Sequence, residues 1–207
     1  MESVKMLLCL KDFLRRVKLL PCRFWMNRNI GNKTYISKHY IIFGDCKYIK
    51  IGDRCKIMAG ARIETVTDYM GGRFSPTILI GDDVAINQNF HCTCASKIEI
   101  GQGTSITANC GIFDIEHPYY NININPRFER IKTKEVKIGK NCLIGMNSVI
   151  LPGAILGDHV IVGANSTLRA GFYPSYTVVA GSPACIVKRY DFKDKIWKKV
   201  CKVGVDS

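Results

Sequence analysis

The sequence predicts an all-β protein, a parallel β-helix of about five or more hexapeptide coils, with a helical appendage at each end. Three regularities in the 207-residue chain support this fold: an apolar residue recurs every six positions, glycine follows many of these residues, and a mostly small residue comes four positions later. A period of six does not match the α-helical period of about 3.6, whereas it matches a short strand, a corner and the next strand. Such repeats bury their apolar side only by stacking, with coils about 4.8 Å apart.

The apolar repeat has fifteen positions, and three strands per coil group them into about five coils. These positions are Ile51, Ile57, Ile63, Ile80, Ile86, Cys92, Ile100, Ile106, Ile112, Ile138, Ile144, Ile150, Leu156, Val162 and Leu168. The mostly small residues four positions after them are Cys55, Ala61, Thr67, Val84, Thr104, Cys110, Cys142, Ser148, Ala154, Val160 and Ser166, with Phe90 as a large exception. Residues 30–50 are predicted to form an irregular first coil. An antiparallel sandwich is the alternative, but its strands do not keep a fixed six-residue step.

Several of the ten cysteines fall in this repeat, where a reduced thiol acts as a small core residue. No pair has the two-residue gap of a zinc finger or a thioredoxin motif. Cys92 and Cys94 beside His91 leave a metal site as the alternative, although no second pair of ligands accompanies them.

Two insertions interrupt the period. The step from Ile63 to Ile80 is 17 residues and the step from Ile112 to Ile138 is 26 residues, in place of six. They predict loops over 64–77 and 118–137. Loops of this length inside a compact repeat usually carry function.

The chain ends differ from the repeat in charge. Of a net charge of +13, residues 1–30 carry +5 and residues 185–207 carry +4. A nucleic-acid binder would show a basic stripe on its folded body, so no nucleic-acid partner is expected. Residues 2–20 are predicted to form an amphipathic helix that either caps the first coil or also rests on an anionic membrane. Residues 190–202 are predicted to form a capping helix.

The expected organisation is therefore a basic N-terminal segment over 1–30, a β-helix over 31–184 and a basic C-terminal cap over 185–207. No apolar run reaches the roughly 18 residues of a membrane-spanning helix, and no signal peptide is evident. A cytoplasmic location is expected, with peripheral contact at the inner face of the cytoplasmic membrane as an open question.

Three segments carry a family resemblance. They are Phe113-Asp114-Ile115-Glu116-His117-Pro118, the run from Ile138-Gly139 to Gly163-Ala164-Asn165-Ser166, and Ala180-Gly181-Ser182-Pro183-Ala184 followed by Ile186-Val187-Lys188. In this order they resemble the left-handed β-helix acyltransferases, especially the sugar O-acetyltransferases that act on maltose, galactosides, lipopolysaccharide and capsule. The resemblance implies a left-handed β-helix, a homotrimer, acetyl-CoA bound between neighbouring prisms, and no required metal.

The resemblance also implies a site. His117 is the expected general base, since imidazole suits proton transfer from a sugar hydroxyl at neutral pH. The expected acceptor contacts are Asn87, Asn89, Asp114, Glu129 and Leu143, with Glu116 as a further candidate. Leu143 stands where most relatives have Trp, and Cys94 or Ala95 where they have an acceptor Asp, so a different acceptor from maltose is expected.

For coenzyme A the resemblance implies contacts along the second half of the repeat. The expected residues are Gly145, Met146, Gly163, Ala164, Ser182 and Pro183, with Arg169, Lys188 and Arg189 near the 3′-phosphate. The expected function is O-acetylation of a sugar hydroxyl in lipopolysaccharide O-antigen or capsule biosynthesis. The alternatives are an N-acetyltransferase of an amino-sugar nucleotide, an antibiotic acetyltransferase, a γ-type carbonic anhydrase, which needs three converging histidines, and a non-catalytic scaffold.

Overall fold

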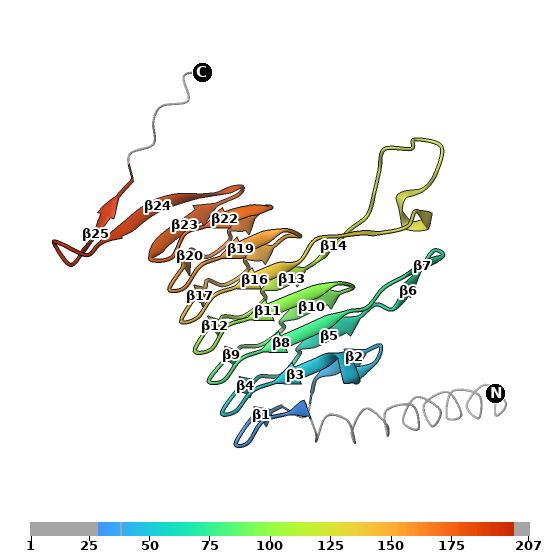
Figure 1. The fold of residues 1–207 in the computed structure, drawn as a ribbon, viewed down its shortest axis with the longest axis horizontal. Helices are drawn as coiled ribbons and strands as arrows, with labels where there is room; N and C mark the ends of the chain where they lie inside the picture. Colours follow the sequence, from blue (N-terminus) through green and yellow to red (C-terminus); the bar gives the residue numbers. More distant parts are fainter. Residues whose placement is uncertain (1–28, 38, 201–207) are drawn as a thin grey trace, which may run out of the picture.

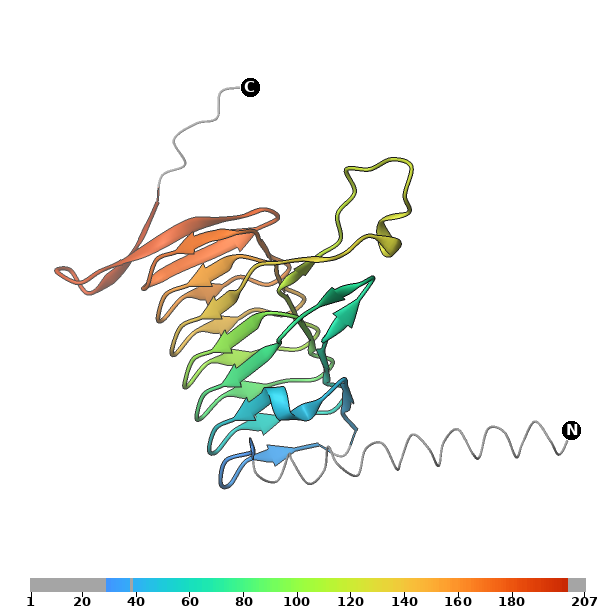
Figure 2. The same ribbon diagram turned by 45° about the vertical axis from the view of Figure 1, so that its right-hand side comes forward.

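The protein is a three-sided prism of stacked coils in a computed structural model that describes residues 29–37 and 39–200. Figures 1 and 2 show the coils stacked from the first strand to the last, with two long excursions leaving the same side. The predicted left-handed parallel β-helix is confirmed. The predicted helix over 2–20 lies outside the described residues, and so does the rest of 1–28.

Three long sheets form the faces of the prism, and each coil takes one strand from each sheet. Sheet 1 contains β1 (Tyr35–Ile36), β4 (Lys56–Ile57), β9 (Ala85–Ile86), β12 (Ser105–Ile106), β17 (Leu143–Ile144), β20 (Ile161–Val162), β23 (Thr177–Gly181), β24 (Ala184–Asp191) and β25 (Ile196–Lys199). Sheet 2 contains β2 (Ile41–Phe43), β5 (Arg62–Thr65), β10 (His91–Cys94), β13 (Gly111–Phe113), β18 (Val149–Ile150) and β21 (Thr167–Leu168). Sheet 3 contains β3 (Ile49–Ile51), β8 (Thr77–Ile80), β11 (Lys97–Ile100), β16 (Val136–Ile138), β19 (Ala154–Leu156) and β22 (Gly171–Tyr173). Within the described residues these strands make six complete coils, from β1–β2–β3 to β20–β21–β22.

The predicted apolar repeat is the core of the prism. All fifteen predicted apolar side chains are at most 5% exposed. Parallel pairing keeps them in register from coil to coil, as in the column of Ile86, Ile106 and Ile144 in sheet 1. The six-residue step therefore sets both the strand positions and the direction in which each apolar side chain points.

Several of the small positions, those with Cys, Ser or Thr, are hydrogen-bond donors as well as space-fillers. Thr104 Oγ1 donates to the Gly139 carbonyl over 2.9 Å, and Cys110 Sγ donates to the Gly145 carbonyl over 3.2 Å. Each bond reaches the next coil, so the slot suits Cys, Ser and Thr alike. Burial raises the pKa of the Cys110 thiol, which keeps it protonated as a donor. Thr67 was predicted to fill such a slot and does not, because it lies in the first insertion and is only half-buried.

The corner between sheets 1 and 2 carries a ladder of asparagines: Asn89, Asn109, Asn147 and Asn165. Each Nδ2 donates to the Oδ1 of the next, over 3.0, 3.1 and 3.0 Å. All four have a φ between 55° and 60°, the left-handed region that Asn tolerates better than most residues. Asn89 Nδ2 thus donates to the ladder, while the predicted acceptor contact by this exposed residue stays a prediction.

Both insertions leave at the corner between sheets 2 and 3. The first contains the hairpin β6 (Asp68–Tyr69) and β7 (Gly72–Arg73). The second contains the ribbon β14 (Ile115–Glu116) and β15 (Lys132–Thr133) and the short 3-10 helix η2 (Pro126–Phe128). One intact coil, with its turn at Ala95–Ser96, separates the two exits. The first coil has its own 3-10 helix, η1 (Cys46–Tyr48), at this corner.

The predicted C-terminal helix is wrong over residues 190–199. β24 runs antiparallel to β23, and β25 runs antiparallel to β24, so the chain extends sheet 1 as a hairpin. A helix there would leave the edge of β23 without backbone partners, which is costly for a strand. Tyr190 and Trp197 pack together across the hairpin, with ring centroids 5.3 Å apart. Trp197 is partly buried, and it lies in β25 instead of the predicted helix.

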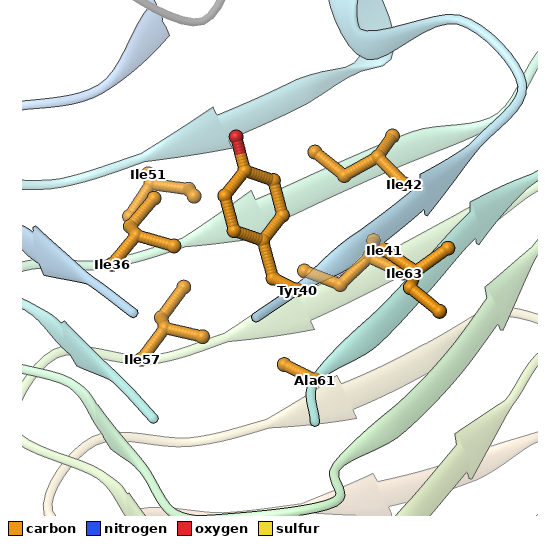
Figure 3. Close-up of a pocket in the computed structure, with 8 residues that line it drawn as sticks. All are labelled: Ile36, Tyr40, Ile41, Ile42, Ile51, Ile57, Ala61 and Ile63. Carbon is orange, nitrogen blue, oxygen red and sulfur yellow. The ribbon is translucent and has the colours of Figure 1, made fainter. Parts of the chain in front are cut away.

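The opposite end of the prism is apolar. A small pocket there is lined by Ile36, Tyr40, Ile41, Ile42, Ile51, Ile57, Ala61 and Ile63 (Figure 3). Tyr40 alone among these side chains bears a polar group. This lining suits packing rather than catalysis.

The asparagine ladder gives a stability prediction. Asn109→Gly removes two ladder hydrogen bonds but tolerates the φ of 60°, and it should lower the free energy of unfolding by about 1 kcal/mol. Asn109→Ala adds the left-handed strain and should cost about 1–2 kcal/mol more. Urea unfolding measures both variants. Equal losses for Gly and Ala would contradict the contribution of backbone strain.

Candidate active site

The long loop starts from a buried carboxylate. Asp114 is 0% exposed, and its two oxygens accept the backbone N–H groups of Ala95 and Ser96 over 2.8 and 2.7 Å. Cys94 Sγ donates to the same carboxylate over 3.2 Å. Burial raises the pKa of the Asp114 carboxyl, and these hydrogen bonds oppose the rise. Asp114 thus joins the start of the loop to the turn of the preceding coil.

The expected contact between Asp114 and an acceptor is therefore corrected. A fully buried carboxylate whose oxygens are already bonded cannot meet a sugar hydroxyl at the surface. The chain also leaves the prism at Asp114, four residues before position 118, where the sequence predicted the loop to begin.

His117 directly follows β14, the first strand of the ribbon. Its imidazole is exposed, and among the described residues neither ring nitrogen has a hydrogen-bond partner. Pro118 behind it is buried. The ring contacts Tyr69 of the hairpin in a T-shaped arrangement, with centroids 5.4 Å apart. An imidazole that is held at a loop base with free nitrogens can accept a proton from a bound hydroxyl.

The two predicted acidic neighbours of His117 differ in environment. Glu116 pairs through its backbone with Lys132 across the ribbon and is half-buried. Glu129 closes η2, and its Oε1 is buried without a hydrogen-bond partner among the described residues. A buried carboxylate oxygen with no donor is unusual in a native protein. Glu129 therefore keeps its place as a candidate acceptor contact, whereas no contact ties Glu116 to His117.

Asn87 lies at the opposite edge of sheet 2 from His117. It follows β9 at the corner between sheets 1 and 2, whereas His117 lies beyond the corner between sheets 2 and 3. Its side chain is half-buried and has no hydrogen-bond partner among the described residues. Asn87 is thus available to a ligand, but a single chain does not bring it to His117.

The predicted coenzyme A residues gather along the same corner as Asn87. Gly145 and Gly163 stack there in successive coils, with Met146 and Ala164 exposed beside them. A Cβ at Gly145 would lie 2.5 Å from the Ala164 nitrogen and 2.6 Å from the Val162 oxygen. Only glycine allows this close stacking, and it leaves a backbone-lined strip on which an extended chain can lie.

The end of this strip is the turn between β23 and β24. Ser182 and Pro183 form the turn, and Ser182 Oγ donates to Thr167 Oγ1 over 2.9 Å. The expected cations do not join it. Arg169 follows β21 at the other edge of sheet 2, and Lys188 and Arg189 pair with Val178 and Thr177 at the far end of β23.

Leu143 lies on the outer face of sheet 1 and is 41% exposed. Its neighbours in register are Ser105 and Ile161. This position is next to the backbone-lined strip rather than to His117. Within one chain, Leu143 can form a wall for a ligand at the strip but cannot reach the histidine.

Sequence reasoning missed Tyr69, whose partner His117 is 48 positions away. Only the insertion length and the Gly71-Gly72 pair indicated a hairpin there. The histidine contact is a tertiary feature with no local signal.

Comparison with known proteins places the chain. The family described as "Bacterial transferase hexapeptide (six repeats)" matches residues 135–170. The Escherichia coli K12 protein named "Putative lipopolysaccharide biosynthesis O-acetyl transferase WbbJ" is 36% identical over 173 residues, which cover 77% of this chain and 87% of that protein. The chain belongs to the hexapeptide-repeat acyltransferases. It is therefore an enzyme that transfers an acyl group.

Solved structures agree on the fold of this acyltransferase. AntD, an N-acyltransferase from Bacillus cereus in complex with dTDP and 3-hydroxybutyryl-CoA, superposes with a TM-score of 0.63 at 20% identity and covers 80% of this chain and 84% of its own. An AntD variant with dTDP and coenzyme A gives the same TM-score at 22% identity, over 80% and 85% of the two chains. At these identities the likeness concerns the fold alone.

The part of the chain from 29 to 200, apart from residue 38, has no group of three or more His, Cys, Asp or Glu side chains placed to hold a metal ion. Cys92 and Cys94 are buried free thiols. None of the described helices has the length and apolarity that crossing a bilayer requires.

Asp114 gives the prediction for this site. Asp114→Ala removes the acceptor of two buried amides, and it should lower the free energy of unfolding by about 2–4 kcal/mol. Asp158 is the matched control, because it is exposed and its Oδ1 accepts one backbone amide, that of Lys140. Asp158→Ala should cost about 1 kcal/mol or less. Urea unfolding compares them, and equal losses would argue against a special role of the buried carboxylate.

Proposed function

We propose that this acyltransferase is a homotrimer that transfers acetyl from acetyl-CoA to a sugar hydroxyl in surface-polysaccharide biosynthesis. The similarity to a protein named for lipopolysaccharide O-acetyl transfer supports the acceptor class and favours O- over N-acetylation. An amino-sugar nucleotide is the second candidate acceptor, since AntD is an N-acyltransferase crystallised with dTDP.

One observation carries the proposal: the candidate residues divide between the two edges of sheet 2. Asn87 and the backbone-lined strip at Gly145 and Gly163 lie at one edge, and His117 with the long loop lies at the other. In a cyclic trimer, the His117 edge of one protomer faces the strip of its neighbour, so each interface completes a site.

The long loop supports this arrangement because it exposes apolar side chains. Its exposed large residues are Tyr119, Tyr120, Ile122, Ile124 and Phe128, and Ile122 is 94% exposed. Exposed apolar groups gathered on one excursion mark an interaction surface. Figure 2 shows the loop extending away from its own prism, which fits a loop that covers the neighbouring protomer.

The chemistry then follows from the residues. Asn87, with a free amide, and Glu129, with an unpartnered oxygen, are suited to hold sugar hydroxyls. His117 accepts the proton as the hydroxyl oxygen attacks the thioester carbonyl. The same imidazole returns the proton to the coenzyme A sulfur as the carbon–sulfur bond breaks, so the enzyme ends as it began.

The cellular setting belongs to the same proposal. Buried free thiols such as Cys55, Cys92 and Cys142 suit a reducing compartment, which supports a cytoplasmic reaction. The basic segment 1–30 would bring each trimer to an anionic membrane surface if it is exposed, at about 1 kcal/mol for each Lys or Arg near the lipid.

His117→Ala is expected to lower turnover by about 10²–10⁴-fold, because the base that accepts the hydroxyl proton is lost. Release of free thiol from acetyl-CoA is measured against a panel of nucleotide sugars and polysaccharide repeat units. Binding of coenzyme A, measured by calorimetry, should be retained. His159→Ala is the control histidine, since His159 stacks on Tyr176 at another corner. A His117→Ala enzyme with near-native turnover would remove the assignment.

Shared sites give a second prediction. His117→Ala and Ala164→Glu each inactivate one half of a site, and Ala164 is exposed, so folding should tolerate the change. Any mixed trimer keeps one intact site of three and should show about one third of wild-type activity. Differently tagged chains are co-expressed and the mixed trimers purified. Chains carrying both changes, mixed with His117→Ala chains, are the control without activity. Inactive mixed trimers would contradict a site between protomers.

A further inference from the structure

The hairpin β6–β7 and the long loop contact each other outside the prism. The two insertions start from coils separated by one intact coil, and both views show them on the same side of the molecule (Figures 1 and 2). Three contacts join them, and Tyr69 makes two of these. The hairpin has no other assigned part in the reaction.

Tyr69 touches the long loop at both ends of its side chain. Its ring packs against the His117 ring with an interplanar angle of 76° and centroids 5.4 Å apart. Its hydroxyl donates a hydrogen bond to the backbone carbonyl of Arg127 in η2. The tyrosine thus bridges the base of the loop, where the histidine lies, and the far segment of the loop.

A second contact runs beside the first. Arg130 of the long loop lies over the Phe74 ring, with its guanidinium carbon 5.7 Å from the ring centroid. A Cβ at Gly72 would lie 2.7 Å from Arg130 Nε, so glycine at this position makes room for the arginine. The hairpin therefore holds the loop through two aromatic residues, Tyr69 and Phe74.

The hairpin turn is strained at the residue after Tyr69. Met70 and Gly71 are the two turn residues, with φ of 43° and 73°. Positive φ at both positions is the geometry of a tight two-residue hairpin turn, and Met is an unusual residue for it. Strain of this kind persists where the surrounding structure requires it, and it gathers at functional sites.

We propose that Tyr69 is a positioning residue for His117, and that the first insertion belongs to the active site for this reason. The proposal rests on the proposed role of His117 as the base. An exposed imidazole with no hydrogen bond to orient it can rotate between several rotamers, and a ring packed edge to face against it restricts them. A base is effective only when its nitrogen is held within hydrogen-bond reach of the reacting hydroxyl.

Activity measurements test the two contacts separately. Tyr69→Leu removes the ring contact and should lower kcat by about 10–100-fold, as expected for a misplaced base, with KM for acetyl-CoA unchanged. Tyr69→Phe keeps the ring but loses the bond to Arg127, and a fall in kcat of about 2–10-fold is expected for one hydrogen bond. Tyr35→Leu is the matched control, since Tyr35 is 56% exposed on β1 in the first coil, and it should leave kcat unchanged.

A double-mutant cycle distinguishes positioning from general destabilisation. If Tyr69 acts through His117, Tyr69→Leu should have no further effect on the residual turnover of His117→Ala. An equal loss in both backgrounds, or unchanged kcat in Tyr69→Leu, would overturn the proposal.

A spectroscopic measurement tests the contact between the two rings independently of enzyme activity. The ring protons of His117 are observed by NMR in the trimer with 13C-labelled histidine and assigned with His117→Ala. Contacts between the Tyr69 and His117 rings should appear in the wild type and in Tyr69→Phe, and their absence in the wild type would overturn the proposal even if Tyr69→Leu fails to fold. If His117→Ala is fully active, the base assignment fails, while these ring contacts still report whether Tyr69 orients His117.

Discussion

Parallel stacking of identical coils is the constraint on which the rest of this structure depends. The inward apolar side chains lie on one another in successive coils, as Ile86, Ile106 and Ile144 do, and small polar residues such as Thr104 and Cys110 donate to a carbonyl one coil along. The stabilising contacts of a coil are therefore with its two neighbours, as in other repeat proteins. A side chain on a face of the prism has little freedom to change, because the strand beside it repeats the same geometry. Variation, and with it chemistry, is confined to the corners.

The three corners of the prism differ in how easily they can accept an insertion. At the corner between sheets 3 and 1, a Cβ at Gly139 would lie 2.4 Å from the Gly157 carbonyl carbon, so the backbone is too closely stacked to bulge out. At the corner between sheets 1 and 2, the asparagine ladder joins successive coils side chain to side chain. At the corner between sheets 2 and 3, Gly44 approaches the Thr65 backbone in the first coils, but no asparagine ladder or glycine stack continues among the described residues, and both insertions leave there. The long loop therefore leaves at the corner between sheets 2 and 3, whereas the ladder corner, which also holds the backbone-lined strip at Gly145 and Gly163, keeps its regular turns.

The repeat could be predicted from sequence because its signal is local and periodic. The same residues locate the strands and the corners and show which side chains point inward. The errors concern features that depend on distant partners. The run around Trp197 has a pattern compatible with a helix, but the unpaired edge of β23 makes it a strand. The motif around His117 located the histidine, while the burial of Asp114 depends on the turn at Ala95 one coil earlier. The asparagine ladder did have a signal: Asn recurs three residues after Ile86, Ile106, Ile144 and Val162.

Stacking also restricts the two insertions to a few fixed positions along the prism axis. Loop length is free to vary, but a loop can leave the prism only where a coil turns, in steps of about 4.8 Å along the axis. The hairpin and the long loop leave about two steps apart, and the Tyr69 and His117 rings meet at 5.4 Å. Moving either exit by one coil would change that separation by nearly the whole contact distance. The distance between the two exits therefore cannot change in small steps. A descendant of this enzyme could keep the contact only by moving both insertions together or by changing the length of one of them.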